Sequence, residues 1–188
     1  LIEFACGNGK VISDIRGAGF TGNILWVDYN KEMIEVARAR LPNESFLQGD
    51  ILQAETFLPK KKYDYVICLN SLHNLPNKEM IFAFLQTMKE YTKDWWYVIF
   101  DVRNALNPWV NYGYSKNRKR WLQFYTLLPW TVKKIFEKDF KLLIDIWVNY
   151  HEAQKGKNPL KNSLLYLYFH LTQMKHFSPY RLFLFRKN

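Results

Sequence analysis

Apolar runs and amphipathic segments alternate along the first half of the chain. The runs hold consecutive apolar residues, as strands buried on both faces do, and we expect them to form a parallel sheet. The segments between them repeat apolar residues every three or four positions, which predicts helices, and Pro42 ends one of these. The expected strands are 1–5, 23–28, 45–48, 63–69 and 95–102, and the expected helices are 10–19, 31–41 and 78–93.

The second half of the chain is less regular and is rich in aromatic residues. Its expected elements are a helix over 131–138, a strand over 141–150, a helix over 160–175 and a last strand over 180–186. Together the two halves predict the α/β class: a doubly wound, mostly parallel sheet with helices on both faces and an antiparallel C-terminal strand.

A glycine-containing loop joins the first expected strand to the first expected helix. From Glu3 to Gly9 it reads Glu-Phe-Ala-Cys-Gly-Asn-Gly. Glycine lets the backbone approach a ligand closely, and the helix that follows presents free N–H groups and the positive end of its dipole. Asp28 follows 19 residues after Gly9, at the end of the second expected strand. A glycine loop followed at this distance by an acid is typical of nucleoside-cofactor binding.

Two features of this loop argue against a dinucleotide cofactor. Such folds use a third glycine for close packing of the helix on the strand, but Ile12 stands at that position. Glu3 lies inside the first strand, where a buried acid is costly unless a cation pairs with it. A cationic nucleoside therefore fits the loop better than NAD does.

With these motifs the chain resembles the class I S-adenosylmethionine-dependent methyltransferases. The resemblance implies that Glu3 meets the methionine amino end, often through water, and that Asp28 binds the ribose. It also implies that Asp50 meets the adenine amino group, that Ile51 packs on the adenine ring, and that the segment 70–75 lines the methionine side. The cofactor-binding residues expected from it are Glu3, Ala5, Cys6, Gly7, Gly9, Asp28, Tyr29, Asp50, Ile51, Asn70 and Ser71.

The likeness covers essentially the whole chain, and two departures accompany it. We expect a single methyltransferase domain over 1–188, with a cofactor-binding half, 1–103, and an acceptor-side half, 104–188. A helical insertion is expected at about 151–179. Ala5 stands where the family usually has glycine, which narrows the loop. The chain begins inside the first strand, so the helices that precede this strand in the family are expected to be missing by truncation.

Methyl transfer requires mainly that donor and acceptor are aligned and that water is excluded. A base is needed only for an acceptor that starts protonated and is not acidic itself. His73 and Asp101 are the candidate catalytic residues, as a base or as groups that orient the acceptor, because both lie at carboxyl ends of expected strands. Arg103, Tyr112 and Tyr114 are candidate acceptor contacts, with surface or packing roles as the alternative. No Cys/His cluster has metal-ligand spacing, so no metal is expected.

The positive charge of the chain belongs to its second half. Residues 1–100 carry a net charge of −1, residues 101–188 a net charge of +11, and the whole chain +10. Such asymmetry favours an anionic partner: a phosphorylated acceptor, a nucleic acid or a membrane surface. The stretch 118–121, Arg-Lys-Arg-Trp, and the pair Lys133-Lys134 are expected to contribute a basic face. A solvated lysine-rich surface is the alternative.

The residues after the fourth strand narrow the acceptor. Methylation of adenine or cytosine amino groups in this family typically uses Asn or Asp followed by Pro-Pro and an aromatic residue, whereas this chain has Asn-Ser-Leu-His at 70–73. The pattern Leu-His-Asn-Leu at 72–75 and the insertion resemble the small-molecule branch, of ubiquinone-biosynthesis type. We therefore expect O- or N-methylation of a small or lipid-linked metabolite. Methylation of RNA or a nucleotide and a non-catalytic binding module are the alternatives.

The cellular compartment is inferred from the cysteines and the hydropathy. Cys6 and Cys68 fall in expected buried strands or at their edges, which favours a reducing compartment. We expect a cytoplasmic protein without a transmembrane segment, since no apolar run is long enough to span a bilayer. Peripheral contact with a membrane is left open.

Overall fold

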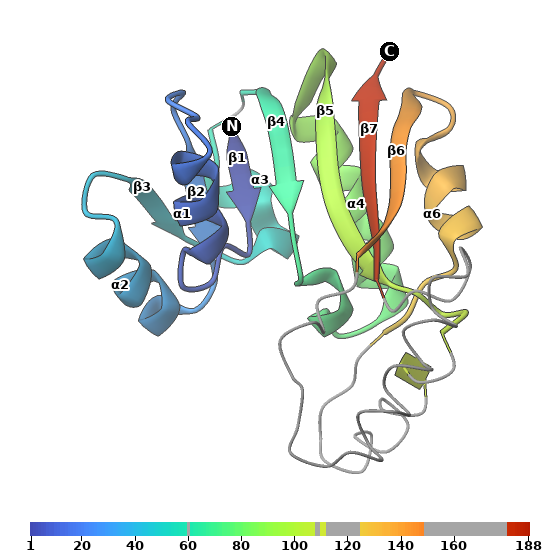
Figure 1. Cartoon of the computed structure of the whole chain (residues 1–188), viewed down its shortest axis with the longest axis horizontal. Helices are drawn as coiled ribbons and strands as arrows, with labels where there is room; N and C mark the ends of the chain where they lie inside the picture. Colours follow the sequence, from blue (N-terminus) through green and yellow to red (C-terminus); the bar gives the residue numbers. More distant parts are fainter. Residues whose placement is uncertain (60, 108–109, 112–124, 149–179) are drawn as a thin grey trace.

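Seven strands form one sheet in the order β3-β2-β1-β4-β5-β7-β6 (Figure 1). The computed structural model describes the chain except for residues 60, 108–109, 112–124 and 149–179. All neighbouring strands are parallel apart from β7, which runs antiparallel to both β5 and β6. The doubly wound, mostly parallel sheet with an antiparallel C-terminal strand is thereby confirmed. The strands are β1 (Ile2–Phe4), β2 (Leu25–Asp28), β3 (Ser45–Gln48), β4 (Tyr63–Cys68), β5 (Thr92–Arg103), β6 (Phe140–Val148) and β7 (Tyr180–Lys187).

Helices pack on both faces of this sheet (Figure 1). On one face Ile12 of α1 packs with Trp26 of β2 in a small cluster. On the other face the larger core joins Phe84 of α4 and Phe136 of α6 to the inner residues of the central strands. The helices are α1 (Lys10–Gly17), α2 (Lys31–Arg40), α3 (Ala54–Phe57), α4 (Lys78–Tyr91) and α6 (Pro129–Phe136), with short 3-10 turns η1 (Ile51–Gln53) and η2 (Leu72–Asn74).

Part of the larger core is a group of stacked aromatic rings. The ring of Phe100 in β5 lies 5.3 Å from that of Phe136 and 5.6 Å from that of Phe183, centroid to centroid. Phe136 and Phe185 are closer still, at 4.5 Å. Such pairs contribute about 0.5–1.5 kcal/mol beyond the area they bury. They fix α6 on β7 and so hold the antiparallel part of the sheet to the parallel part.

The boundary between α4 and β5 differs from the expectation. The helix was expected to continue to residue 93 and the strand to begin at 95, but α4 ends at Tyr91 and β5 begins at Thr92. Tyr63 pairs with Thr92 and Tyr65 with Tyr97, so β5 carries three extra residues opposite β4. This bulge contains Trp95, which has φ 70 and is 69% exposed. A bulge of this size leaves no local signature in the hydrophobic pattern.

The remaining elements agree with the expected ones to within a few residues or lie outside the described residues. The sequence pattern did not predict η1 and α3, because both are too short to show a helical period. The helix expected over 160–175 and the insertion at 151–179 fall outside the described residues. In the part of the chain that is described, no helix has the length and hydropathy needed to cross a bilayer.

Candidate functional site

The carboxyl ends of β1, β2, β4 and β5 lie along one edge of the sheet, the lower edge in Figure 1. The loop after β1 contains the glycines, Asp28 ends β2, Asn70 follows β4, and Arg103 ends β5. Because parallel strands end on the same side, four segments that are distant in sequence meet here. In open α/β sheets this edge is where ligands bind.

The loop from Ala5 to Gly9 makes a tight turn through left-handed backbone. Ala5, Gly7 and Gly9 have φ values of 55, 54 and 76. A Cβ on Gly9 would lie 3.2 Å from the Cβ of Ala37 in α2, so glycine is required there both for its φ and for space. Ala5 takes its left-handed conformation with a Cβ, which costs on the order of 1 kcal/mol. Glycine, which the family usually has at this position, would adopt this conformation without that cost.

Asp28 ties this loop to the end of β2. Its Oδ2 accepts a hydrogen bond from the Gly7 amide at 2.7 Å, and its Oδ1 accepts one from the Asn30 amide at 2.9 Å. Its carbonyl oxygen accepts from the Gly49 amide at 2.9 Å, which brings the segment after β3 alongside. A carboxylate offers about four acceptor positions, so Asp28 keeps capacity for the hydroxyls of a ribose.

Glu3 is a buried acid with an unsatisfied oxygen. It is 1% exposed, and its Oε2 has no hydrogen-bond partner. Burial, and secondarily the negative charge of Asp28, raises the pKa of Glu3 to about 8. Leaving such a group unpaired is unfavourable. A ligand with an ammonium group would satisfy it, and the methionine end of S-adenosylmethionine carries one. The residues present therefore fit this cofactor.

The two cysteines lie among these acids. Burial is the main cause that raises the pKa of both thiols, and the charges of Glu3 and Asp28 act on both in the same direction. Asp101 adds to the effect on Cys68. The thiols are therefore protonated and poor nucleophiles. The shared influence indicates that the acids of β1 and β2 lie near both thiols.

The segment after β4 is joined to both neighbouring strands. Asn70, with φ 55, donates its backbone N–H to Oδ1 of Asp101 in a short hydrogen bond. The Ser71 hydroxyl donates to the carbonyl of Leu69 at 3.0 Å and approaches that of Ala5 at 3.4 Å. Asp101 is buried, and burial raises its pKa despite the Asn70 amide. Its observed contact thus fixes the loop that carries Asn70 and Ser71.

His73 is buried in η2 and faces Arg103. The Nη2 of Arg103 lies 3.3 Å from Nε2 of His73 and donates to Oδ1 of Asn70 at 3.2 Å. Burial, followed by the charge of Arg103, lowers the pKa of His73 to about 3. The imidazole is therefore neutral near pH 7. Since a guanidinium only donates, Nε2 is the accepting nitrogen in this contact.

The expected adenine-side residues lie at the outer end of the same edge. Asp50 is exposed, and its Oδ1 caps η1 by accepting from the Leu52 amide at 2.9 Å. Ile51 is 8% exposed and belongs to the larger core, whereas Tyr29 is 72% exposed. Gly49 connects this group to Asp28 through its backbone. The capping role of Asp50 leaves its second carboxylate oxygen for a ligand.

Sequence reasoning missed one member of this edge. Tyr180, the first residue of β7, lies under Arg103, with the guanidinium carbon 3.5 Å from the ring centroid. The two residues pair across the antiparallel β5–β7 ladder. Tyr180 looked like an ordinary strand residue because its partner is distant in sequence. Only the position of β7 next to β5 could have identified it.

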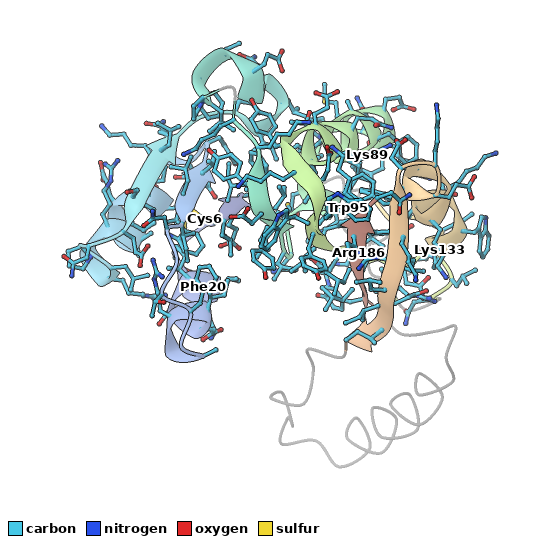
Figure 2. All side chains as sticks on the ribbon, turned by 90° about the horizontal axis from the view of Figure 1, so that it is seen from above. Cys6, Phe20, Lys89, Trp95, Lys133 and Arg186 are labelled. Carbon is cyan, nitrogen blue, oxygen red and sulfur yellow. The ribbon has the colours of Figure 1, made fainter. Side chains whose placement is uncertain are left out.

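Other expected site features are distributed differently. Lys133 of α6 (Figure 2) is ion-paired with Asp145 at 2.7 Å, and Arg181 also binds Asp145, so the three side chains form one ion-pair network. Lys134 is exposed. Tyr112, Tyr114 and the stretch 118–121 lie outside the described residues. Within the ranges that are described, no group of three His, Cys, Asp or Glu side chains could hold a metal ion.

Comparison with known proteins places these features in context. Residues 1–94 match the family model described as a methyltransferase domain. A protein of Invertebrate iridescent virus 6 named Putative methyltransferase 235L is 33% identical over 88 residues, which make up 47% of this chain and 32% of that protein. The match thus spans about a third of the length of this relative.

Solved structures share the fold at low sequence identity. A SAM-dependent methyltransferase from Archaeoglobus fulgidus has a TM-score of 0.67 at 16% identity, over 99% of this chain and 85% of that one. Magnesium protoporphyrin IX methyltransferase from Synechocystis PCC 6803, with bound SAH, has a TM-score of 0.67 at 15% identity, over 100% and 73%. The N-methyltransferase NodS from Bradyrhizobium japonicum WM9, in complex with S-adenosyl-L-homocysteine, has a TM-score of 0.64 at 15% identity, over 99% and 76%.

Proposed function

Because the chain belongs to the methyltransferase domain family, we propose that it transfers a methyl group from S-adenosylmethionine to an oxygen or nitrogen atom of a small or lipid-linked metabolite. The observation that carries the proposal is the buried Oε2 of Glu3, which lacks a hydrogen-bond partner beside a left-handed glycine loop. A buried carboxyl group with an unsatisfied oxygen next to a nucleoside-binding loop calls for a ligand that is both a nucleoside and a cation.

Each part of the edge has a role in this proposal. Glu3 holds the ammonium group, the turn over 5–9 lets the backbone approach the ligand, and Asp28 accepts hydrogen bonds from the ribose hydroxyls. Asp50, Ile51 and Tyr29 border the adenine, and Cys6, Asn70 and Ser71 line the methionine side. When bound, S-adenosylmethionine supplies a methyl carbon made electrophilic by the sulfonium. The half 1–103 thus provides the cofactor site, and 104–188 the acceptor side.

His73 and Asp101 act by orienting other groups in this proposal. Nε2 of His73 faces the guanidinium of Arg103 and is not aimed at a proton of the acceptor. Asp101 fixes Asn70 through its backbone. Neither arrangement is that of a general base poised near neutral pH. An acceptor that is acidic by itself, or that carries a free lone pair, requires no such base.

Isothermal titration with S-adenosylhomocysteine tests the cofactor assignment. The full-length protein is expected to bind one molecule with micromolar affinity, and the isosteric variant Glu3→Gln is expected to bind at least about tenfold more weakly, since a charge-assisted hydrogen bond is lost. Asp14→Asn, an exposed acid of α1 paired only with Lys10, is the matched control. Absence of binding at high micromolar ligand would refute the proposal.

Methylation of RNA is the second candidate function, and only the positive charge of the second half of the chain supports it. It predicts RNA binding that weakens steeply with salt. Asp145 offsets one of the two positive charges of Lys133 and Arg181, which weakens the basic face on which that candidate relies. Gel-shift measurements at two salt concentrations distinguish it from a small-molecule enzyme, for which no salt-sensitive RNA complex is expected.

A further inference from the structure

Arg103 ends β5 at the same edge as the acids of the cofactor site, but it carries the opposite charge. Glu3 and Asp28 lie on β1 and β2, whereas Arg103 lies two strands away from β1, beyond β4. The carboxyl edge therefore has an acidic side over β1 and β2, whereas the end of β5 carries both the buried Asp101 and the guanidinium of Arg103. A cationic ligand is favoured beside Glu3 and Asp28, and an anionic one beside the Arg103 guanidinium.

Three neutral side chains hold the Arg103 guanidinium in place. Asn70 accepts from its Nη2 at 3.2 Å, His73 lies at 3.3 Å from the same nitrogen, and the ring of Tyr180 lies 3.5 Å below the guanidinium carbon. Arginine stacks on aromatic faces in this way and then loses less side-chain entropy on binding a partner. These three contacts fix the direction of the guanidinium, whose charge also acts on the nearby Asp101.

The neutrality of His73 is part of this arrangement. A protonated imidazole would repel Arg103 and would offer no acceptor to it. Burial keeps His73 neutral well below pH 7 by lowering its pKa. The contact between Asn70 and Arg103 is exposed, and the contact between His73 and Arg103 is partly buried.

We propose that Arg103 anchors an anionic group, a carboxylate or phosphate of a small molecule, on the methyl acceptor, with His73, Asn70 and Tyr180 as its positioning residues. This inference rests on the proposed function, because it assigns the charge of the acceptor at the same site. A planar guanidinium binds carboxylate and phosphate through paired hydrogen bonds. The acceptor class is then an anionic metabolite with its nucleophilic atom directed at the cofactor side.

Ligand-detected NMR titrations on protein saturated with S-adenosylhomocysteine test the proposal. The probes are benzoate, phenyl phosphate and the neutral benzamide. At least one of the two anions is expected to bind, and Arg103→Gln is expected to weaken it about tenfold or more, with partial recovery in Arg103→Lys. Arg186→Gln removes the same charge from the opposite end of β7 (Figure 2) and is expected to leave anion binding within about twofold.

The positioning role of His73 has its own readout. His73→Gln keeps a neutral acceptor near Arg103 and is expected to retain anion affinity within about threefold, whereas His73→Leu removes the acceptor and is expected to behave like Arg103→Gln. Binding of benzoate, which stays ionised in this range, by the unsubstituted protein is expected to be flat between pH 5 and 8, because His73 does not titrate there. A rise in affinity as the pH falls through 6.5 would contradict this role.

A second set of titrations distinguishes an anionic group on the acceptor from the carboxylate that the cofactor itself carries. S-adenosylhomocysteine and 5′-methylthioadenosine, which lacks the amino-acid part, are titrated into ligand-free protein. If Arg103→Gln weakens the first and spares the second, the anion is the cofactor's own and the proposal is overturned. Equal binding of benzamide and benzoate, or no anion binding, also overturns it. Failure of the unsubstituted protein to bind S-adenosylhomocysteine would instead refute the proposed function.

Discussion

Asp28 accepts a hydrogen bond of 2.7 Å from the backbone amide of Gly7, so the acid expected to bind the ribose also shapes the glycine loop. The two residues belong to different strand ends, and the bond fixes the loop of β1 against β2. Under the proposed function, ligand binding and local backbone order both depend on this one carboxylate. A substitution at Asp28 acts on both.

Asp28→Asn is expected to destabilise the ligand-free protein by about 1–3 kcal/mol. Two backbone amides lose a charged acceptor, because one then faces the NH2 group of the asparagine and the other faces its carbonyl oxygen, a weaker acceptor. Urea unfolding followed by circular dichroism measures this change. Asp14→Asn, whose exposed carboxylate pairs with Lys10 in a single helix, is expected to change stability by less than about 0.5 kcal/mol. Equal effects of the two substitutions would remove Asp28 from its role in the loop.

Cofactor binding is expected to release a proton from Glu3. The pKa of the free carboxyl is raised to about 8, so it is protonated at pH 7. An ammonium partner lowers that pKa, and the proton leaves on binding. Affinity for S-adenosylhomocysteine should then increase as the pH rises toward 8. Titrations in two buffers with different ionisation enthalpies measure the release, which should vanish in Glu3→Gln.

The same carboxyl affects the stability of the ligand-free protein. A folded-state pKa above the ordinary value of 4.5 contributes stability below pH 4.5 that is lost as the pH rises to about 8. Glu3→Gln should therefore raise the melting temperature at pH 8 and above while it weakens cofactor binding. A variant that is less stable than the unsubstituted protein at pH 9 would show that Glu3 is paired within the protein.

Two glycines of the first helical region are expected to respond oppositely to alanine. Gly9→Ala places a Cβ at 3.2 Å from the Cβ of Ala37 on a left-handed backbone, which is expected to cost about 1–3 kcal/mol. Gly17, at the end of α1, has nothing within 4 Å of such a Cβ, and Gly17→Ala is expected to stabilise by up to about 1 kcal/mol. Thermal unfolding of both variants provides the comparison.

Ala5→Gly should relieve strain in the turn. The left-handed φ of Ala5 is unfavourable for a residue with a Cβ, and glycine offsets this at the cost of greater freedom in the unfolded chain. The net change is expected to be a stabilisation of up to about 1 kcal/mol by chemical denaturation, with unchanged or stronger cofactor binding. Destabilisation by more than about 1 kcal/mol would mean that the methyl group of Ala5 packs usefully.

The sequence predicts the parts of this candidate site that a local pattern marks. Glu3, Gly7 and Gly9 follow from a strand, a glycine turn and a helix that succeed one another directly, and Asp28 follows from its distance from Gly9. Hydrophobic runs predicted each strand of the described residues. Periodicity and local turn chemistry are sufficient where neighbours in sequence are neighbours in space.

The rest of the site depends on pairings between distant segments. The stacking of Arg103 on Tyr180 requires that β7 lie beside β5, and nothing local marks either residue for the other. His73 was identified as a candidate, but its neutrality and its orientation toward Arg103 result from burial under the folded edge. The bulge at Trp95 likewise arises from the register between β4 and β5.

A crystal structure of the full-length protein with S-adenosylhomocysteine tests the central claim most directly. The account predicts that the ligand's ammonium nitrogen lies within hydrogen-bonding reach of Glu3, directly or through one water, and that its ribose hydroxyls donate to Asp28. A nucleoside bound elsewhere, with Oε2 of Glu3 still buried and unpaired, would contradict the claim.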